Sequence, residues 1–331
     1  MDEFDWIQTY LAPLAGPEGL QLLDDAALYT PRGDQDLILT QDSLIEGIHF
    51  FKGEYGAGTA NRLMTVNLSD LAAKGARPVG YLLSVAWPKH LKSADLQGWM
   101  QAFSKGLKTE QERFGFSLFG GDTVKTDGPM SISATFIGVV PSGTAVLRSG
   151  AQDGDDIWVT GTIGDAYLGL RLAQDTSSIL KHNPTPEDLW VWEEAFRHPI
   201  PKLIFRKTLR RYATACADIS DGLLSEAGHI AKASRKSLIV RLDDIPISSA
   251  SMKWCVGKDN KAKRVELATA GDDYELLFTA RPKNADHIQI GAAKLNLAVT
   301  RVGKVTEGQG VKCLGSDGKA LILEKLGYSH N

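Results

Sequence analysis

The segment VLRSGAQDGDD, residues 146–156, constrains the fold more than any other part of the chain. It is rich in turn-forming residues, and it separates two stretches that each alternate helix-like and strand-like patterns. Few contacts cross a segment of this kind, so we expect two domains, at residues 1–148 and 149–331. The length of 331 residues agrees with this division, because one domain usually holds roughly 100 to 200 residues.

The first half has the pattern of an α/β domain. Apolar spacing predicts helices over residues 4–12, 59–74 and 93 to about 114. Gly75 and Pro78 are expected to end the second helix, and Ser93 to cap the third. Short apolar runs predict strands at residues 36–40, 79–86, 116–119 and 130–140.

The second half repeats the α/β pattern. Strands are expected at residues 157–160, 237–241 and 274–279, with a short apolar segment at 215–217. Helices are expected from Asp165 onward and over residues 201–212 and 222–233, with a polar stretch at 181–188. We therefore expect an α/β fold in both halves.

Charge and composition exclude several classes of function. A net charge of -3 gives no broad basic field, so nucleic acid is not an expected partner. No apolar run approaches the roughly 18 residues of a membrane helix, and the acidic N-terminus does not resemble a secretory signal. The 3 cysteines lie far apart and are expected to be reduced thiols, which favours a cytoplasmic protein without a membrane partner.

Aspartates recur beside small or turn-forming residues at the edges of apolar elements. The segments are LLDDAAL, TQDSLIEGIHF, NLSDLAAKGA, FGGDT, DISDGL and AGDDYELLF. One such aspartate is usually a helix cap or a turn former. Gathered together, these carboxylates would repel one another unless cations bound them, and Mg²⁺ commonly shares oxygen ligands with substrate phosphates. The set therefore predicts Mg²⁺ around a polyphosphate.

Two further features agree with a nucleotide ligand. The glycines of Gly120-Gly121-Asp122-Thr123, expected just after a strand, would let backbone N–H groups approach a phosphate, although an ordinary glycine turn explains the tetrapeptide equally well. Arg148, at the expected boundary, is a candidate for bidentate phosphate contact, whereas taken alone it would be explained better as a solvated charge in a linker. The chain contains neither a GxxxxGK[ST] loop nor a strand followed by GxGxxG, so ATP would require another fold.

Taken together, the motifs resemble those of the thiamine-monophosphate kinase family, in the superfamily of aminoimidazole ribonucleotide synthetase. The resemblance covers nearly the whole chain and is carried by TQDSLIEGIHF, NLSDLAAKGARP, GGDT, LRSGAQDGDDIWVTGTIGDA, DISDGLLSEAGHIAKAS and AGDDYELLF. It implies a two-domain α/β (α+β) fold, in which the N-terminal domain dimerises through a β-barrel and a C-terminal α/β domain packs beside it. ATP would lie in a cleft between the domains.

The resemblance also implies the reaction, which is Mg²⁺-dependent, in-line transfer of the ATP γ-phosphoryl group to thiamine monophosphate, giving thiamine diphosphate. An acceptor phosphate needs no essential general base, so no catalytic base is expected. By motif position, the metal ligands would be Asp25, Thr40, Gln41, Asp42, Asp70, Asp122, Asp218 and Asp221. The ATP-binding residues would be Gly121, Asp122, Arg148 and Ser220, and the substrate-binding residues His49, Asp272 and Tyr328.

The chain departs from the family pattern at three points. Leu23 stands where the family has a glycine-rich approach to its first acidic pair. Gln41 occupies a position that usually holds a hydroxyl residue, so its backbone carbonyl could replace a side-chain ligand. Asp272 stands in place of a glutamate and is one methylene shorter, so it could reach substrate through water.

Two alternatives remain open at this stage. Another enzyme of the superfamily, such as aminoimidazole ribonucleotide synthetase, would share the metal and ATP motifs but phosphorylate an amide oxygen. A selenophosphate synthetase would carry a reactive N-terminal cysteine, and the hydrogenase maturation enzyme a C-terminal one, whereas this chain ends LGYSHN. From a different class, the aspartates could form a non-catalytic metal-binding module.

Overall fold

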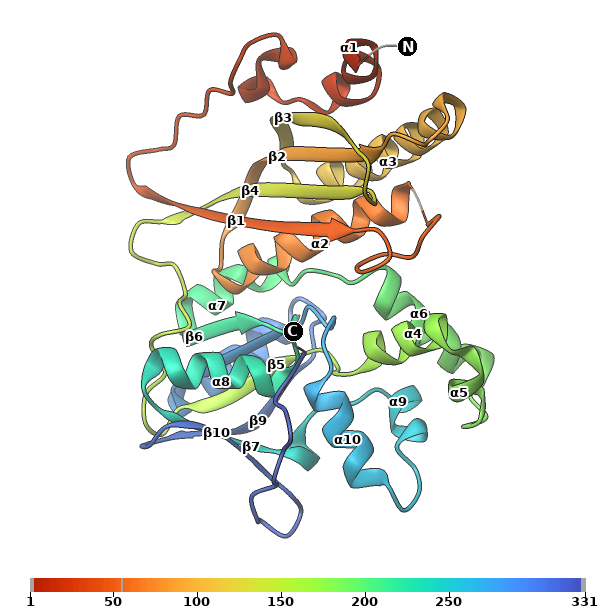
Figure 1. Cartoon of the computed structure of the whole chain (residues 1–331). Coiled ribbons are helices and arrows are strands. Elements are labelled where there is room, and N and C mark those ends of the chain that lie inside the picture. The colour runs from red at the N-terminus through yellow and green to blue at the C-terminus, as the bar shows by residue number, and fades with distance from the viewer. Residues whose placement is uncertain (1–2, 55, 329–331) are drawn as a thin grey trace. The chain divides into compact units, whose positions relative to one another are not determined.

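The structure is a computed structural model that describes residues 3–54 and 56–328, apart from the side chains of residues 3, 4 and 93 (Figure 1). Its contacts divide the chain into two compact units. Unit 1 comprises Met1–Leu71 and Ala76–Thr144, and unit 2 comprises Ala72–Gly75 and Ala145–Asn331. The main division falls at Thr144, whereas the sequence pattern places the domain boundary after residue 148.

Unit 1 is built on one four-stranded sheet with the order β1-β4-β2-β3. The strands are β1 Gln35–Ile45, β2 Arg77–Pro88, β3 Ser117–Thr126 and β4 Ser131–Pro141. All neighbours are antiparallel except β2 and β3, which are parallel. A parallel pair needs a long crossover, and helix α3, Ser93–Phe114, supplies it.

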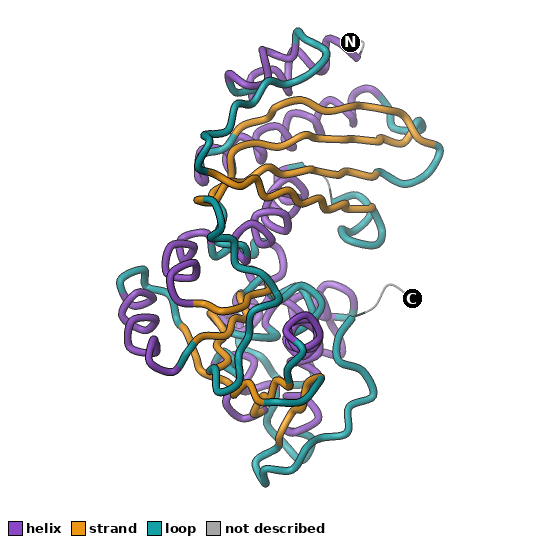
Figure 2. The backbone as a smooth tube through the Cα atoms, turned by 90° about the vertical axis from the view of Figure 1, so that its left-hand side faces the viewer, coloured by secondary structure: helices purple, strands orange, loops and turns teal. Residues whose placement is uncertain are grey.

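The two faces of this sheet differ. Ala134 and Phe136 of β4 are fully buried on the face that packs against α3 and α2, Ala57–Ala73. Figure 2 shows these helices and the strands as two layers of unit 1. The opposite face is covered by neither α2 nor α3 and is called the helix-free face below, and its alternate side chains include exposed Leu39 and Val124.

The N-terminal segment of unit 1 is irregular. It contains α1 Glu3–Trp6, a π-helix Ile7–Leu11 and the 3₁₀ turns Ala12–Leu14 and Pro17–Leu22. Leu20 and Gln21 have positive φ angles of 51° and 60°, so the last turn is kinked. The Gly16 N–H donates to the Leu118 carbonyl over 3.1 Å, which ties the segment to β3. The helix expected over residues 4–12 is therefore α-helical only in part.

Unit 2 contains a six-stranded sheet with the order β10-β7-β9-β5-β8-β6. The strands are β5 Asp156–Thr160, β6 Ala213–Asp218, β7 Ser237–Arg241, β8 Leu276–Ala280, β9 Val299–Thr306 and β10 Gly310–Leu314. Only β7 and β10 are parallel. The apolar faces of β5, β6, β7 and β9 form the main core with α8, Leu223–Ser234.

A second, smaller core of unit 2 joins helices far apart in sequence. It lies around Trp192, Leu168 and Trp254. The helices here are α4 Asp165–Gln174, α5 Thr176–Leu180, α6 Pro186–Arg197, α9 Ser249–Trp254 and α10 Asn260–Thr269. The remaining helices, α7 Arg206–Tyr212 and α11 Ala285–Ala293, pack against each other.

Several expected elements are confirmed and several need correction. Helix 59–74, helix 93–114, helix 222–233 and strand 237–241 appear as α2, α3, α8 and β7. Residue 93 is already helical, so Lys92 rather than Ser93 occupies the N-cap position of α3. Pro201–Tyr212 holds a 3₁₀ turn followed by α7. Strands β9 and β10 and helices α9, α10 and α11 were not expected.

Two corrections concern apparent loops. The polar stretch 181–188 contains the start of α6, because Thr185 and Asp188 form a capping box and Pro186 occupies the first turn. The segment Gly120–Thr123 lies inside β3 rather than after a strand. Among the described residues, no helix is long and apolar enough to cross a membrane. Cys216, Cys255 and Cys313 are free and buried.

Candidate functional site

Three of the predicted metal ligands gather on the helix-facing side of β1. Thr40 and Asp42 point to the same face because side chains alternate along a strand. The Thr40 hydroxyl donates to the Asp70 carboxylate on α2, and the Asp42 backbone N–H donates to Oδ1 of Asn67 over 3.1 Å. One turn of α2 thus supplies both partners of β1, and Asp42 and Asp70 are half-buried.

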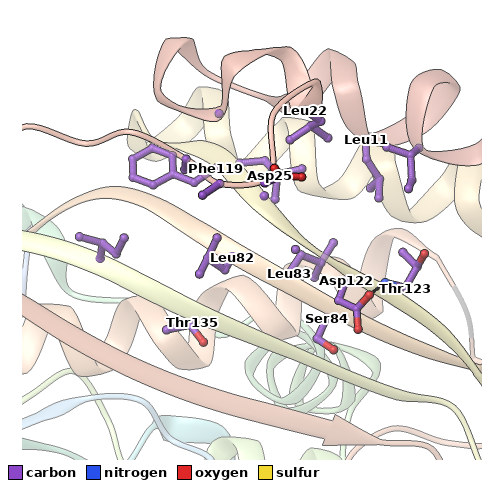
Figure 3. A pocket seen from close by; sticks show the side chains of 18 of the residues that line it. Leu11, Leu22, Asp25, Leu82, Leu83, Ser84, Phe119, Asp122, Thr123 and Thr135 are labelled. Carbon is purple, nitrogen blue, oxygen red and sulfur yellow. Dashed lines mark hydrogen bonds between the residues drawn. The ribbon is translucent and has the colours of Figure 1, made fainter. Parts of the chain in front are cut away.

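Three other predicted ligands lie on the helix-free face. Asp25, Gln41 and Asp122 line a cavity of about 720 Å³ between the N-terminal segment and the sheet of unit 1. In Figure 3, Leu11 and Leu22 point toward the sheet from the N-terminal segment, and Asp25 of the same segment lies above the strands. Gln41 sits one residue from Thr40 but on the opposite face, where its Oε1 accepts from the Thr135 hydroxyl at 3.0 Å.

Polar side chains form a row across this helix-free face. Asp122, Ser84, Ser133 and Ser43 occupy neighbouring register positions on β3, β2, β4 and β1. The Ser43 and Ser133 hydroxyls lie 2.7 Å apart, and Ser84 and Asp122 lie close together in Figure 3. Asp122, Ser84 and Ser133 of this row line the cavity on the side of the sheet, together with apolar residues such as Leu82, whereas Leu11 and Leu22 line it from the N-terminal segment.

Gly121 has a structural reason to be glycine. A Cβ atom at this position would lie 1.8 Å from the Leu83 carbonyl oxygen on β2. The close approach of two strands therefore accounts for Gly121. Gly120 has no comparable contact, since its nearest neighbour would be 3.6 Å away.

His49 closes the turn after β1. The Nδ1 of His49 accepts the Ile45 backbone N–H over 3.1 Å, and the backbone N–H of His49 donates to the Ile45 carbonyl over 2.9 Å. In the neutral ring this leaves the proton on Nε2. The half-buried imidazole therefore holds the turn through Nδ1.

In unit 2, two loops interlock through their backbones. The loop of residues 218–222 begins at the last residue of β6, and the loop of residues 271–275 precedes β8. The Asp272 N–H donates to the Ser220 carbonyl, and the Tyr274 N–H to the Ile219 carbonyl, both over 2.8 Å. This pairing brings the predicted residues Asp218, Ser220, Asp221 and Asp272 into one cluster.

Asp272 has an unusual backbone conformation. Its φ is 73°, and that of Tyr274 is 50°. Such angles are sparsely populated for non-glycine residues and persist only where surrounding contacts hold them. The Tyr274 hydroxyl donates to Oδ1 of Asp272 over 3.1 Å, which fixes the carboxylate relative to its own loop.

Arg148 lies beside this cluster and forms an ion pair. Its Nη2 donates to Oε2 of Glu226 in α8 over 3.1 Å. The Arg148 side chain is 44% exposed and that of Glu226 only 1%. Burial raises the pKa of Glu226, and the positive charges of Arg148 and His229 oppose that shift.

Tyr328 is attached to the same cluster. Its backbone N–H donates to the Asp221 carbonyl over 2.8 Å, and Gly327 packs so closely that a Cβ there would lie 2.3 Å from that oxygen. The Tyr328 side chain is 54% exposed. The end of the described chain is thus tied to the 218–222 loop.

The predicted ligands therefore form separate sets within their own units. Among the described residues, no group of three or more His, Cys, Asp or Glu side chains comes together as a metal cage. In the same part of the chain, Asp25, Asp70, Asp122 and Asp221 form no ion pair with lysine or arginine. Each set contains oxygen donors alone, which suits a hard cation that completes its shell with phosphate or water.

Sequence reasoning missed several partners. Asn67 lies inside α2 and Glu226 inside α8, so the sequence does not mark either as a site residue. The structure shows that Asn67 contacts β1 and that Glu226 contacts Arg148. Glu275 accepts from Thr160 at 2.5 Å and pairs with Lys202 at 2.9 Å, so it anchors the base of the 271–275 loop. Asp273 accepts from the Gly164 N–H, and burial raises its pKa well above the ordinary range.

Comparison with known proteins defines the class. Residues 23–140 match the model for the AIR synthase related protein, N-terminal domain. Residues 152–315 match the model for the AIR synthase related protein, C-terminal domain. Both halves of the chain are therefore domains of this class, in the expected order.

Curated relatives define the family more narrowly. The thiamine-monophosphate kinase of Caulobacter vibrioides is 39% identical over 99% of this chain and 90% of its own length. That of Salmonella typhimurium is 35% identical over 93% of this chain and 90% of its own length. The chain belongs to the thiamine-monophosphate kinase family.

Solved structures agree with this family. The crystal structure of thiamine-monophosphate kinase from Stenotrophomonas maltophilia has a TM-score of 0.79 and 39% identity, covering 91% of each chain. AaThiL complexed with AMPPCP and TMP has a TM-score of 0.76 and 28% identity, covering 99% of this chain and 97% of its own. The hydrogenase maturation protein HypE of Escherichia coli, at a TM-score of 0.76 and 17% identity, shares the fold alone.

Proposed function

We propose that this protein transfers the γ-phosphoryl group of ATP to thiamine monophosphate and releases thiamine diphosphate and ADP. The observation that carries the proposal is the family relationship along almost the entire chain, with 39% identity over 99% of its residues. The relative complexed with AMPPCP and TMP supports the same pair of substrates. The oxygen donors of each unit, such as Thr40 with Asp70, also fit cations that bind a polyphosphate.

Phosphoryl transfer requires alignment of two phosphates and neutralisation of the charge on the equatorial oxygens. Arg148, Ser220 and the backbone at Gly121 are the proposed contacts for ATP. Arg148 brings a guanidinium whose planar donors match phosphate oxygens. The acceptor is a phosphate oxygen that is already ionised near neutral pH, so the proposal includes no essential general base.

The oxygen donors of both units fit Mg²⁺. Asp42 and Asp70 with the Thr40 hydroxyl form one proposed ligand set, and Asp25, Asp122 and the carbonyl or amide of Gln41 form another. Asp218 and Asp221 form the third. When bound, Mg²⁺ would neutralise phosphate charge and act as a template for the two substrates.

Three residues are proposed to bind thiamine monophosphate. His49 lies in the turn after β1, where its Nδ1 accepts the Ile45 N–H. Asp272 presents a carboxylate fixed by Tyr274, and the exposed ring of Tyr328 would stack on the thiamine ring system. The attachment of the Tyr328 backbone to Asp221 supports a role for an ordered aromatic side chain.

The helix-free face of unit 1 supports a homodimer. Leu37, Leu39 and Val124 are 44%, 65% and 46% exposed on the open face of the sheet. Apolar area of this kind is normally covered. We propose that a second copy covers it and that the two sheets close into a β-barrel. Light scattering of the wild type and of Leu39→Asp tests this, because the variant should be monomeric.

The functional domains are proposed at residues 1–148 and 149–331, with the activity in the cytoplasm. Buried free cysteines support a reducing compartment. Another enzyme of the superfamily and a non-catalytic metal-binding module are the alternatives, and no observation favours either.

One assay tests the proposed function. Purified protein is incubated with ATP, Mg²⁺ and thiamine monophosphate, and the products are separated by chromatography. We expect thiamine diphosphate and ADP in equal amounts. Intact ATP without thiamine diphosphate would favour the metal-binding module, and ATP consumed only with an amide substrate would favour the synthetase-like alternative.

A further inference from the structure

Helix α8 holds Arg148 through both its side chain and its backbone. Near the start of α8, Oε2 of Glu226 accepts Nη2 of Arg148 over 3.1 Å. At the last residue of α8, the Ser234 hydroxyl donates to the Arg148 carbonyl over 3.0 Å and accepts from the Gly150 N–H over 3.1 Å. These contacts, both made by α8, therefore fix the place of Arg148 and the direction of its guanidinium.

Glu226 is an unusual residue for its position. Its side chain is 1% exposed, whereas the buried neighbours on the same helix are apolar residues such as Leu223, Leu224 and Ile230. The Nδ1 of His229 lies 3.3 Å from the same Oε2 that accepts from Arg148. Oε1 is buried without a hydrogen-bond partner among the described residues. A half-satisfied buried carboxylate is unfavourable for folding, so packing alone does not explain it.

The position of Glu226 along α8 links two parts of the candidate site. Its backbone N–H donates to the Gly222 carbonyl over 3.1 Å, so it lies one turn after the 218–222 loop. The negative charge of Asp221 is close enough to act on the Glu226 carboxyl, as is the positive charge of Arg148. Glu226 therefore contacts Arg148 through its side chain and the 218–222 loop through its backbone, so it links the positions of the two.

The ion pair leaves most of the guanidinium available. Among the described residues, Arg148 donates from its side chain through Nη2 alone. A guanidinium has five N–H donors in a fixed plane, so Nε and Nη1 remain for an anion. A free arginine must lose rotamer freedom when it binds phosphate, and prior fixation removes part of that cost.

We propose that Glu226 is a positioning residue that holds the Arg148 guanidinium in the orientation that binds the phosphates of ATP. This inference rests on the proposed function, in which Arg148 contacts ATP. The Glu226 charge also repels a polyphosphate, but it is buried and paired with Arg148 and His229. The gain from orienting the Arg148 guanidinium therefore exceeds the repulsion between Glu226 and the phosphates. Loss of the Glu226 carboxylate should thus weaken nucleotide binding.

A double-mutant cycle separates positioning from a general structural role. Glu226→Gln keeps the volume of the side chain and removes its charge, and Arg148→Ala removes the group that it positions. Binding of AMPPCP with Mg²⁺ is measured by calorimetry for the wild type, both single variants and the double variant. KM values for ATP and thiamine monophosphate are measured in parallel. Glu226→Met, of similar volume, replaces Glu226→Gln if that variant does not fold.

In the wild-type background, Glu226→Gln should weaken AMPPCP binding about tenfold, within the range of coupling between contacting residues. KM for ATP should rise similarly while KM for thiamine monophosphate stays unchanged. In the Arg148→Ala background the same substitution should cause no further loss. Glu307→Gln is the control, because Glu307 pairs with Lys236 beyond the end of α8 and should leave binding unchanged.

Equal losses in both backgrounds would overturn the inference, since Glu226 would then act independently of Arg148. Unchanged or tighter binding by Glu226→Gln in the wild-type background would overturn it as well. The proposed function is judged separately, by whether the wild type makes thiamine diphosphate. AMPPCP binding can show the coupling even if the acceptor is a different molecule.

Discussion

The ligand clusters of the two units are built in different ways. In unit 1, Thr40, Asp42 and Asp70 project from a regular strand and a regular helix. Side chains of α2 hold the strand, since Asp70 accepts from the Thr40 hydroxyl and Asn67 from the Asp42 backbone N–H. In unit 2, the 218–222 and 271–275 loops carry the acidic residues, and backbone hydrogen bonds hold the loops together. The cluster of unit 1 therefore depends on which side chains are present, and the cluster of unit 2 depends on the backbone conformation of its two loops.

This difference predicts different sensitivities to mutation. An isosteric change in unit 1 should remove charge without disturbing the scaffold. A small change in backbone freedom in unit 2 should disturb both stability and activity, because residues such as Asp272 have positive φ angles that only the surrounding contacts maintain.

The largest effect is expected for Asp42→Asn. The substitution keeps the shape of the side chain and the backbone N–H that donates to Asn67, but it removes a proposed metal-ligating charge. Turnover should fall by about three orders of magnitude, comparable with the loss of an electrostatic group at a reacting centre. The melting temperature should stay within about two degrees, since side-chain changes of this kind are small. Steady-state kinetics showing activity within a few fold of the wild type would contradict this assignment.

The next effect is expected for Gly271→Ala. A Cβ atom at Gly271 would lie 2.2 Å from the Ser220 carbonyl oxygen, so the two loops must separate. The free energy of unfolding should fall by about 2 kcal/mol, as overpacking typically costs. Chemical denaturation measures this loss, and activity should fall with it.

The matched control is Gly228→Ala, within α8 of the same unit. Its Cβ would meet Leu326 at an ordinary distance of 3.6 Å. The free energy of unfolding should rise by about 0.5 to 1 kcal/mol, because alanine favours a helix over glycine. If Gly271→Ala proved as harmless as this control, the backbone pairing would not hold the loops.

The smallest effect is expected for Tyr274→Phe, which removes the hydroxyl that donates to Asp272. Loss of one hydrogen bond, worth about 1 kcal/mol, should raise KM for thiamine monophosphate about fivefold. KM for ATP should not change, because Arg148 and Ser220 keep their contacts. Equal changes in both KM values would show that Tyr274 supports the cluster as a whole.

The regular parts of the fold could be predicted from the sequence. Helix α3 ends with Gly115 at a φ of 73°, the left-handed conformation that glycine favours at a helix end. Strand β7 has a continuous apolar pattern and matched its prediction. The α6 helix was missed because its capping box, Thr185 to Asp188, lies in a polar segment that resembles a loop. Local patterns identified regular elements, but they did not distinguish a cap from a loop.

The sequence predicts which residues belong to the candidate site, but it predicts only part of their arrangement in space. Strand alternation separates Gln41 from Thr40 and Asp42, but the sequence could not show which face meets α2. The contact between Glu226 and Arg148 joins residues that are distant in sequence, and packing of α8 creates it. The same holds for the attachment of Tyr328 to Asp221. These contacts depend on tertiary structure rather than on local propensity.

Direct transfer of a phosphoryl group to a phosphate acceptor is tested by following the label. The protein is incubated with ATP labelled in its γ-phosphoryl group, Mg²⁺ and thiamine monophosphate, and the labelled products are separated. The account predicts that the label appears in thiamine diphosphate and that little is released as inorganic phosphate. Label found in inorganic phosphate, with thiamine monophosphate unchanged, would contradict it.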